Sequence, residues 1–552
     1  MDGSLLILWQ SGMQGEIKID DIAQQIGYST KQTKRKLIKW SEEGWLTFTS
    51  GKGRGKKSEL CWLKSVEEEY EKSILIDMDQ NKIEQVSKYL LLNWSIETKQ
   101  RLINAFQSKF GFQSQNEDCL IIPKYHTALT THPLKAADVN SANLIANIYN
   151  RLVALHEDGT ISPEIAYSWE YTKTALTLYI RKDVMFHDGS ILTAEDVVTS
   201  LKRMMQNDHF SFLWTPIAKI FSPVTRVVTL EFPAGCTYVL HLLSLITSSI
   251  FKEVNGNLYG TGGFYLANHT NEKTVLSAFP QYFGVRPLLD RVEFIKVPRD
   301  FEILYHSSEE LKPIDTGQIE SDSGFGIVVM NPYRESDMKR KEVRDYIHAI
   351  IAKHRDELAN EDNRTMGNHE GCLIGYSKRL MPPKLHKPEL TEPILLKYAN
   401  YAMDTTMWFK RLLEQYGFVV QIEKVSFDQM INDSDPLHDA DLFIHGEIFE
   451  LNQSFSYFYF LTNKFSPLHP FTKREVYIKD KLSLYSQTSF EEWMSIHLAI
   501  ENYLQKQSLC VPLYYQKRFI PFSLNVMNVQ IKHFGYVDLT ELWIKSLPET
   551  SK

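Results

Sequence analysis

The early part of the chain carries a helix, a glycine turn and a second helix in close succession. Residues 20–26 begin with two aspartates, which favour the positive end of a helix dipole. Gly27 ends this helix, because glycine adopts the left-handed conformation at little cost. Ser29 or Thr30 can cap a second helix over residues 31–43. So short a connection between two helices predicts a helix-turn-helix.

The second helix is followed by the pattern of a β-hairpin with a basic tip. Leu37 and Trp40 lie three residues apart, so they share one face of the second helix and can pack on the first. Strand patterns cover residues 45–49 and 59–63, and the segment between them, 50–57, is rich in glycine and lysine. Helix, turn, helix and hairpin together predict a winged helix-turn-helix.

Charge is divided unevenly along the sequence. The whole chain of 552 residues has a net charge of −7. Residues 1–64 hold eleven Lys and Arg against seven Asp and Glu, a net charge of +4, so the remaining residues sum to −11. Residues 29–57 contain nine basic residues and only two acidic ones, both glutamates. A basic head on an acidic body indicates two separate tasks.

The basic head has the chemistry of a DNA-binding domain. A helix fits the major groove of double-stranded DNA, where Gln and Arg read base edges, while Lys and Arg of a wing neutralise phosphates. We expect Thr30, Lys31, Gln32 and Arg35 to face the bases. The full set predicted to contact the duplex is Thr30, Lys31, Gln32, Lys34, Arg35, Lys52, Arg54, Lys56 and Lys57. The alternative is a winged helix used for protein contact or as a linker.

Composition constrains the class of protein and the cellular compartment. Hydrophobic residues make up 43% and charged residues 23%, as in globular proteins. No segment approaches the ~20 apolar residues of a membrane span, and no secretory signal is evident. The five cysteines are scattered, which favours a reducing compartment. We therefore expect a cytoplasmic protein without a membrane partner, a cofactor or a metal site.

Two regions follow the head. Residues 65–116 carry helical apolar stripes, which predict a connector of helices; the stripes either pack internally or form a homodimer contact. From residue 117 strands alternate with helices. The run 187–190 contains His187 and Asp188, but its Asp-Gly pair predicts a tight turn and not a catalytic site. No nucleophile elbow, P-loop or spaced metal-ligand set supports a hydrolase or transferase.

The body resembles a known family. Four runs look like the signature region of the family 5 extracellular solute-binding proteins, which include peptide- and nickel-binding components of import systems: 148–153, 159–170, 181–189 and 192–198. Further runs resemble the family at 260–265 (with Gly263 in place of a proline), 287–294, 343–347 and 511–514. With a winged-helix head, the chain resembles the SgrR-type transcriptional regulators.

The resemblance implies an α/β fold: a small winged helix-turn-helix plus a large two-lobed periplasmic-binding-protein-like domain of type II. We predict a DNA-binding domain over 1–64, a connector over 65–116 and a ligand-sensing domain over 117–552. Its crossings are expected near 297–298 and 507–511. Lobe I would then span about 117–297 and 511–552, and lobe II about 298–510.

The resemblance also implies where a small solute sits. Peptide-binding members carry a Gly-Trp-x-x-Asp-Tyr run whose aspartate meets the peptide amino terminus. Residues 446–452 are comparable: Glu450 stands at the aspartate, and Glu447 replaces the tryptophan. Glu447, Glu450 and Asn452 are the candidate ligand-binding residues, for a peptide, sugar or sugar phosphate. Glu450 is otherwise a surface or paired carboxylate. An alternative function is the receptor of an ABC-type importer.

The head's two kinds of basic residue give a first prediction. Arg35→Ala is expected to remove a base contact. The free-energy difference between binding to specific and to random duplexes is then expected to fall by about 1–3 kcal/mol. Lys56→Ala is expected to weaken binding to all duplexes alike, since a phosphate contact carries no sequence information. Gel shifts with specific and random duplexes measure both effects; an equal loss of discrimination in the two variants contradicts the assignment.

Overall fold

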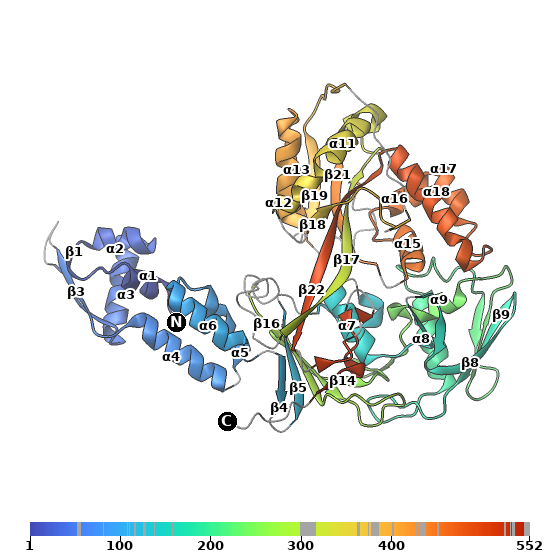
Figure 1. Ribbon diagram of the computed structural model, residues 1–552, viewed down its shortest axis with the longest axis horizontal. Helices are drawn as coiled ribbons and strands as arrows, with labels where there is room; N and C mark the ends of the chain where they lie inside the picture. The colour runs from blue at the N-terminus through green and yellow to red at the C-terminus, as the bar shows by residue number, and fades with distance from the viewer. Residues whose placement is uncertain are drawn as a thin grey trace.

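A computed structural model shows the chain as a small head attached to a body of two lobes. The body contains one sheet-based lobe below and another above, joined by two long strands (Figure 1). The residues that the structure describes are 1–51, 57–80, 82–107, 109, 111–114, 117–124, 128–136, 138–156, 158–298, 316–361, 365–373, 375–376, 386–399, 402–426, 429, 438–449, 452–523, 526–529, 531–532 and 536–545.

The head is a winged helix-turn-helix. Its elements are α1 (Gly3–Gln10), β1 (Gly15–Ile17), α2 (Ile19–Ile26), α3 (Thr30–Glu42), β2 (Leu46–Thr49) and β3 (Ser58–Trp62). The three strands form an antiparallel sheet in the order β1-β3-β2. Gly27 ends α2 with φ +73°, as the sequence predicts. The sequence patterns had indicated neither α1 nor β1.

The connector packs against the head. It consists of α4 (Val66–Asp79), α5 (Ile83–Val86), the 3-10 helix η1 (Ser87–Leu91) and α6 (Ile96–Gln107). Tyr70 and Phe106 are buried in the same core as Leu37 and Trp40, and the edge of Trp45 meets Tyr70 with ring centroids 5.2 Å apart. These apolar stripes are therefore internal packing surface, and head and connector form one core.

Lobe I, the lower lobe of Figure 1, is built on two sheets. The first has the order β14-β15-β16-β5-β4 and the second β10-β11-β9-β8. The first contains β4 (Gly111–Ser114), β5 (Asp118–Lys124), β14 (Phe264–His269), β15 (Lys273–Ala278) and β16 (Arg291–Lys296). The second contains β8 (Ala166–Tyr171), β9 (Ala175–Ile180), β10 (Lys219–Phe221) and β11 (Val227–Glu231). Along β9 burial alternates as predicted, with Leu176, Leu178 and Ile180 inside.

Helices and short hairpins complete lobe I. They are α7 (Val139–Ile148), α8 (Ala194–Met205), α9 (Val239–Ser244) and the 3-10 helices η2 (Pro133–Lys135) and η3 (Ile246–Ser248). The hairpins are β6 (Val153–Leu155) with β7 (Ile161–Pro163), and β12 (Lys252–Val254) with β13 (Asn257–Tyr259). Thr193 and Asp196 form a reciprocal capping box at the start of α8, which explains that pair in the sequence.

Steric crowding explains why glycine occupies positions 260 and 262. A Cβ on Gly260 would lie 2.0 Å from the carbonyl oxygen of Ile148, and one on Gly262 would lie 2.3 Å from that of Asn147. Both contacts are far shorter than van der Waals distance, so glycine is required where this segment passes the end of α7. The motif therefore serves packing.

His187 also has a structural role. Its Nε2 lies 3.0 Å from the carbonyl oxygen of Gly262, and the backbone N–H of Ser190 donates to Asp188 at 2.9 Å. Burial lowers the pKa of His187 to about 4, although the Gly262 hydrogen bond opposes this shift. Gly189, with φ +82°, makes the tight turn that the sequence predicts.

Lobe II is built on one six-stranded mixed sheet in the order β18-β22-β17-β21-β19-β20. Its strands are β17 (Thr316–Met330), β18 (Thr365–Gly367), β19 (Ile394–Ala399), β20 (Val420–Val425), β21 (Leu442–Glu447) and β22 (Cys510–Ser523). Helices α11 (Lys341–His354) and α13 (Met403–Gln415) share a core with the sheet residues Val328 and Ile444.

Four further helices complete lobe II. They are α15 (Gln453–Thr462), α16 (His469–Arg474), α17 (Val476–Leu482) and α18 (Trp493–Lys506), with the 3-10 turn η7 (Phe490–Glu492). Shorter pieces are η4 (Asp337–Lys339), η5 (Arg355–Glu357) and α12 (Leu358–Glu361). Buried residues of α15 and α18 belong to the same apolar cluster as the core of lobe I.

The two long strands β17 and β22 connect the lobes (Figure 1). They pair antiparallel from Thr316 opposite Ser523 to Val329 opposite Cys510. A Cβ on Gly326 would lie 2.1 Å from the ring of Tyr514, so only glycine lets the strands approach this closely. The strands begin at residues 316 and 510, and the exact lobe boundaries remain predictions.

The end of the chain returns to lobe I. It contains β23 (Val526–Met527), β24 (Ile531–Lys532), β25 (Tyr536–Val537), the 3-10 turn η8 (Leu539–Glu541) and β26 (Trp543–Ile544). The backbone N–H of Leu539 donates to the side chain of Asn147 on α7 at 3.3 Å. Lobe I is thus assembled from segments on both sides of lobe II in the sequence.

Candidate functional site

The exposed face of α3 carries the predicted base-reading residues. Thr33, Leu37 and Trp40 are buried against the rest of the head. Because they occupy one side of the helix, the other side is turned to solvent, and the predicted residues on it are all exposed: Thr30, Lys31, Gln32, Lys34 and Arg35. The fold therefore leaves the five predicted residues at the start of α3 accessible to solvent.

Gln32 also takes part in the start of α3. Ser29 accepts a hydrogen bond from the Gln32 backbone N–H at 3.4 Å, and the Gln32 Oε1 accepts from the Ser29 backbone N–H at 3.2 Å, which makes a capping box. A bidentate contact with adenine uses both Oε1 and Nε2 of a glutamine. Such a contact would compete with the cap, so Lys31 and Arg35 are the freer base-reading candidates.

The wing is described at its base. Strands β2 and β3 flank it, and exposed Lys57 lies 3.4 Å from Glu16 of β1 in an ion pair. Both side chains are more than half exposed, so solvent screens the pair and phosphate can replace Glu16. The predicted contacts of Lys52, Arg54 and Lys56 lie outside the described residues and stay predictions.

Asp2 fastens the inner side of α3, which the sequence patterns did not reveal. Its Oδ2 accepts from Lys36 Nζ at 2.9 Å and from Trp40 Nε1 at 3.2 Å. Its Oδ1 caps α1 through the Ser4 backbone N–H at 3.0 Å. The backbone N–H of Asp2 donates to the hydroxyl of Tyr70 on α4 at 2.9 Å. One residue thus ties α3 to α1 and to the connector.

The electrostatics of Asp2 follow from these contacts. Burial by itself would raise the pKa of its carboxyl group. The hydrogen bonds from Lys36, the Ser4 N–H and Trp40, with the Lys36 charge, outweigh burial and lower that pKa. Lys36 is therefore held inward, away from the predicted DNA face. An aspartate directly before an apolar helical segment was the signal that could have identified this cap.

The head is docked on the sheet of lobe I. Ile83 and Val86 of α5 share a core with Ile295 and Val297, at the end of β16. The hydroxyl of Ser87 donates to the carbonyl oxygen of Lys296 at 3.4 Å. These contacts join the connector, and through it the head, to lobe I.

Of the candidate solute residues in the described part of the chain, Asn452 lies beside lobe I, and Glu447 lies at the end of a lobe II strand. Glu447 ends β21 and is half-buried; its Oε2 lies 3.1 Å from His445 Nε2, and its Oε1 accepts from the Ile448 N–H at 3.1 Å. Asn452 caps α15 by accepting from the Phe455 N–H at 3.0 Å. A Cβ on Gly159 of lobe I would lie 3.8 Å from the Asn452 amide nitrogen. Glu450 lies outside the described residues.

Two family matches cover separate parts of the chain. Residues 5–117 match the family described as "Sugar transport-related sRNA regulator N-term". Residues 160–302 match "Bacterial extracellular solute-binding proteins, family 5 Middle". The HTH-type transcriptional regulator SgrR of Yersinia enterocolitica is 24% identical over 98% of both chains. Over nearly its whole length, the chain is similar to SgrR-type transcriptional regulators.

Further relatives of this SgrR-type chain span its whole length. The SgrR regulator of Photorhabdus laumondii is 22% identical over 97% of both chains. The uncharacterized protein YhjP of Bacillus subtilis is 21% identical over 97% of this chain and 96% of its own. The head-and-body arrangement is therefore common to full-length proteins.

Solved structures match the body. The periplasmic binding protein DppA of Helicobacter pylori, in complex with the peptide STSA, has a TM-score of 0.66 at 16% identity, over 80% of this chain and all of its own. NikA of Brucella suis, in complex with Fe(III)-EDTA, has a TM-score of 0.64 at 14% identity, over 77% of this chain and all of its own. These likenesses confirm the two-lobed solute-binding fold.

Other kinds of site were sought in the same residues. Within the ranges given above, three or more His, Cys, Asp or Glu side chains nowhere gather in a metal-binding group. The helices in those ranges are also too short or too polar to span a bilayer.

The position of Asp2 generates a prediction for the head of this SgrR-type chain. Asp2→Ala removes the α1 cap and leaves Lys36 and Trp40 without their acceptor, which is expected to destabilise the head by about 1–3 kcal/mol. Amide hydrogen exchange in α1 and α3 of the full chain is then expected to accelerate about tenfold or more.

Glu16→Ala is the matched control, because it removes a carboxylate of the same head from an exposed ion pair with Lys57. Its expected effect is about 0.5 kcal/mol or less. Equal acceleration in the two variants would show that Asp2 is an ordinary surface charge.

Proposed function

We propose that this chain is a transcriptional regulator that binds double-stranded promoter DNA through α3 and the β2–β3 wing. The observation that carries the proposal is that Thr30, Lys31, Gln32, Lys34 and Arg35, in the first turns of α3, are all exposed. Phosphate contacts by lysine give affinity, and base contacts by Arg35 and its neighbours give specificity. The acidic body repels phosphate, so the duplex is steered to the head.

The second half of the proposal is that a small solute binds between the lobes and controls the head. Glu447 and Asn452 are its candidate partners: Asn452 lies beside Gly159 of lobe I, and Glu447 ends β21 five residues earlier. A half-buried carboxylate favours a solute with an amino group or several hydroxyl groups over a phosphorylated one. A peptide or a sugar therefore fits these two side chains better than a sugar phosphate does.

The proposed place of action is the cytoplasm, where DNA and small metabolites are both accessible. The contacts between α5 and β16 support a route from solute to DNA, because they join lobe I to the head directly. The alternative function, a receptor that delivers solute to an importer, does not explain the basic residues on α3. The proposed role is binding and regulation, without a chemical reaction.

A gel-shift series at rising salt tests the DNA half. Binding is expected to be specific and to weaken steeply, because each neutralised phosphate contributes about −0.9 to the slope of log affinity against log salt. Lys31→Ala is expected to weaken binding, and Lys99→Ala, an exposed lysine of the connector, serves as the control of equal charge. Affinity no higher than for random duplex would refute the DNA-binding role.

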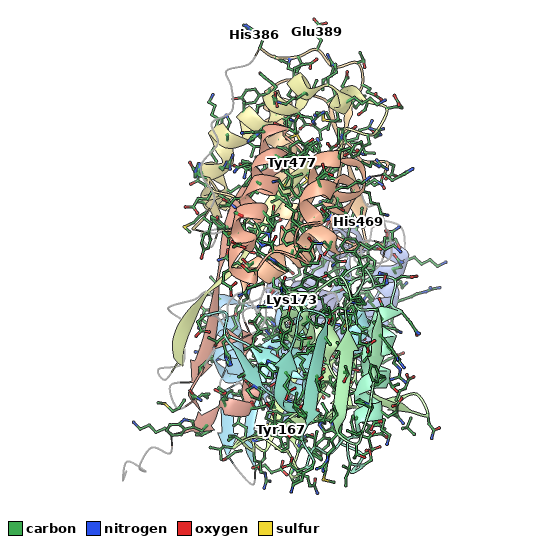
Figure 2. All side chains as sticks on the ribbon, turned by 90° about the vertical axis from the view of Figure 1, so that its right-hand side faces the viewer. Tyr167, Lys173, His386, Glu389, His469 and Tyr477 are labelled. Atoms are coloured by element: carbon green, nitrogen blue, oxygen red, sulfur yellow. The ribbon has the colours of Figure 1, made fainter. Side chains whose placement is uncertain are left out.

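A thermal-shift screen of peptides, sugars and sugar phosphates tests the sensing half. A solute that binds only the folded state stabilises it by about 2.7 kcal/mol when present at 100 times its Kd. Glu447→Gln is expected to reduce the shift by removing the carboxylate while keeping its size. His386→Gln, on a segment far from lobe I (Figure 2), is the control. A response to sugar phosphates alone would contradict the assigned solute class.

A further inference from the structure

The lobes are joined a second time, away from the crossing strands, by direct side-chain contacts. Tyr238, which precedes α9 of lobe I, packs among rings of lobe II: its ring centroid lies 5.3 Å from that of Phe458 and 5.5 Å from that of Trp493. Tyr238, Phe458 and Trp493 are all buried. In Figure 1 this meeting point of α9 with α15 lies to one side of β17 and β22.

His241 extends the contact to the surface turn η7. Its ring stacks on Phe490 with centroids 3.7 Å apart and planes 20° apart, and it also faces Phe455 at 5.9 Å. Burial lowers the pKa of His241 to about 4, although Glu491 opposes this shift, so the ring is neutral at pH 7. His241 is thus a neutral imidazole stacked against two phenyl rings, with both ring nitrogens buried.

Hydrogen bonds fix the register of the same contact. The backbone N–H of Thr237 donates to the carbonyl oxygen of Ser486 at 3.2 Å, and its hydroxyl donates to that of Thr488 at 2.8 Å. Both acceptors lie in the segment between α17 and η7 of lobe II. We call Thr237, Tyr238 and His241, with Phe455, Phe458, Phe490 and Trp493, the latch.

A second group of rings closes the lobes nearby. The ring centroids of His209 and Phe465 lie 3.9 Å apart. Phe210 stacks on Tyr459 with ring centroids 6.1 Å apart and planes 16° apart. His209 and Phe210 follow α8 of lobe I, whereas Tyr459 and Phe465 belong to α15 and the residues after it. The contact is therefore broad, and rotation of the lobes about β17 and β22 must break it.

We propose that the latch holds the two lobes closed before solute binds, and that solute acts on this existing contact through α15. Asn452 caps α15, and Phe455 and Phe458 of the same helix belong to the latch. A solute held by Asn452 therefore shifts the helix that supports the closed state. The regulatory meaning rests on the proposed solute sensing, but the closure itself does not.

The energetic argument concerns preorganisation. A ligand shifts a two-state equilibrium only by its differential affinity for the two states. In a body closed by its own side chains, solute need not supply the free energy of closure, and it regulates by strengthening or loosening the latch. Apolar rings suit this task because their contacts persist at any salt concentration.

The test is solution scattering by the solute-free full chain with a double variant, Thr237→Val with Phe490→Ala. The threonine change keeps side-chain size and removes the hydroxyl bond, and the second change removes the ring that stacks on His241 at the edge of lobe II. The wild type is expected to be compact. The double variant is expected to have a larger radius of gyration and to be cut by protease between the lobes at least about tenfold faster.

Tyr477→Ala is the matched control. Tyr477 is an aromatic residue of the same lobe that stacks on Tyr503 at 4.7 Å, and it lies far above lobe I in Figure 2. It is expected to scatter like the wild type. Thr237→Val alone, with circular dichroism to confirm folding, keeps the test decisive should the double variant misfold, because a partial opening is still expected.

Two outcomes would overturn the latch. One is a wild-type chain that is already extended without solute. The other is a folded double variant whose scattering and cleavage match those of the wild type, which would make these rings simple core packing. Gel shifts on the same proteins separate the two proposals. If the latch opens as expected but the chain shows no specific DNA binding, only the proposed regulatory function is refuted.

Discussion

The body depends on the antiparallel pairing of β17 with β22. These strands are the connection through which lobe II is inserted into the chain of lobe I, and their ladder runs from Thr316 opposite Ser523 to Val329 opposite Cys510. Gly326 permits the close approach of Tyr514, because the Tyr514 ring fills the space that a side chain at position 326 would need. The lobes are therefore joined covalently through these two strands, and their other contacts are noncovalent.

The rest of the molecule is arranged around that pair of strands. On one side the head docks on lobe I, where Ile83 and Val86 bury the end of β16. On another side the rings of α9, α15 and α18 bring the lobes together. The connector thus joins the head to lobe I, whereas lobe II meets lobe I through these rings. This division matches the two family matches, one over the head and connector and the other within lobe I.

Much of this arrangement could be predicted because it depends on local chemistry. Gly27, the Ser29 cap and the alternation of Leu176, Leu178 and Ile180 are properties of single elements, and each appears as expected. The winged helix-turn-helix and the two-lobed fold followed from such patterns and from resemblance, and the comparisons confirm both. The roles of Arg35, Glu447 and Glu450 remain predictions.

The sequence by itself determined most of the elements of the head, the basic head on an acidic body and the resemblance to the SgrR-type regulators. Only the tertiary structure decided that Asp2 fastens α3 through Lys36 and Trp40, since these partners lie 34 and 38 residues away. It alone placed His241 between Phe455 and Phe490. The physical reason is that periodicity and turn chemistry act over a few neighbouring residues, whereas a contact between lobes depends on how distant surfaces meet in three dimensions.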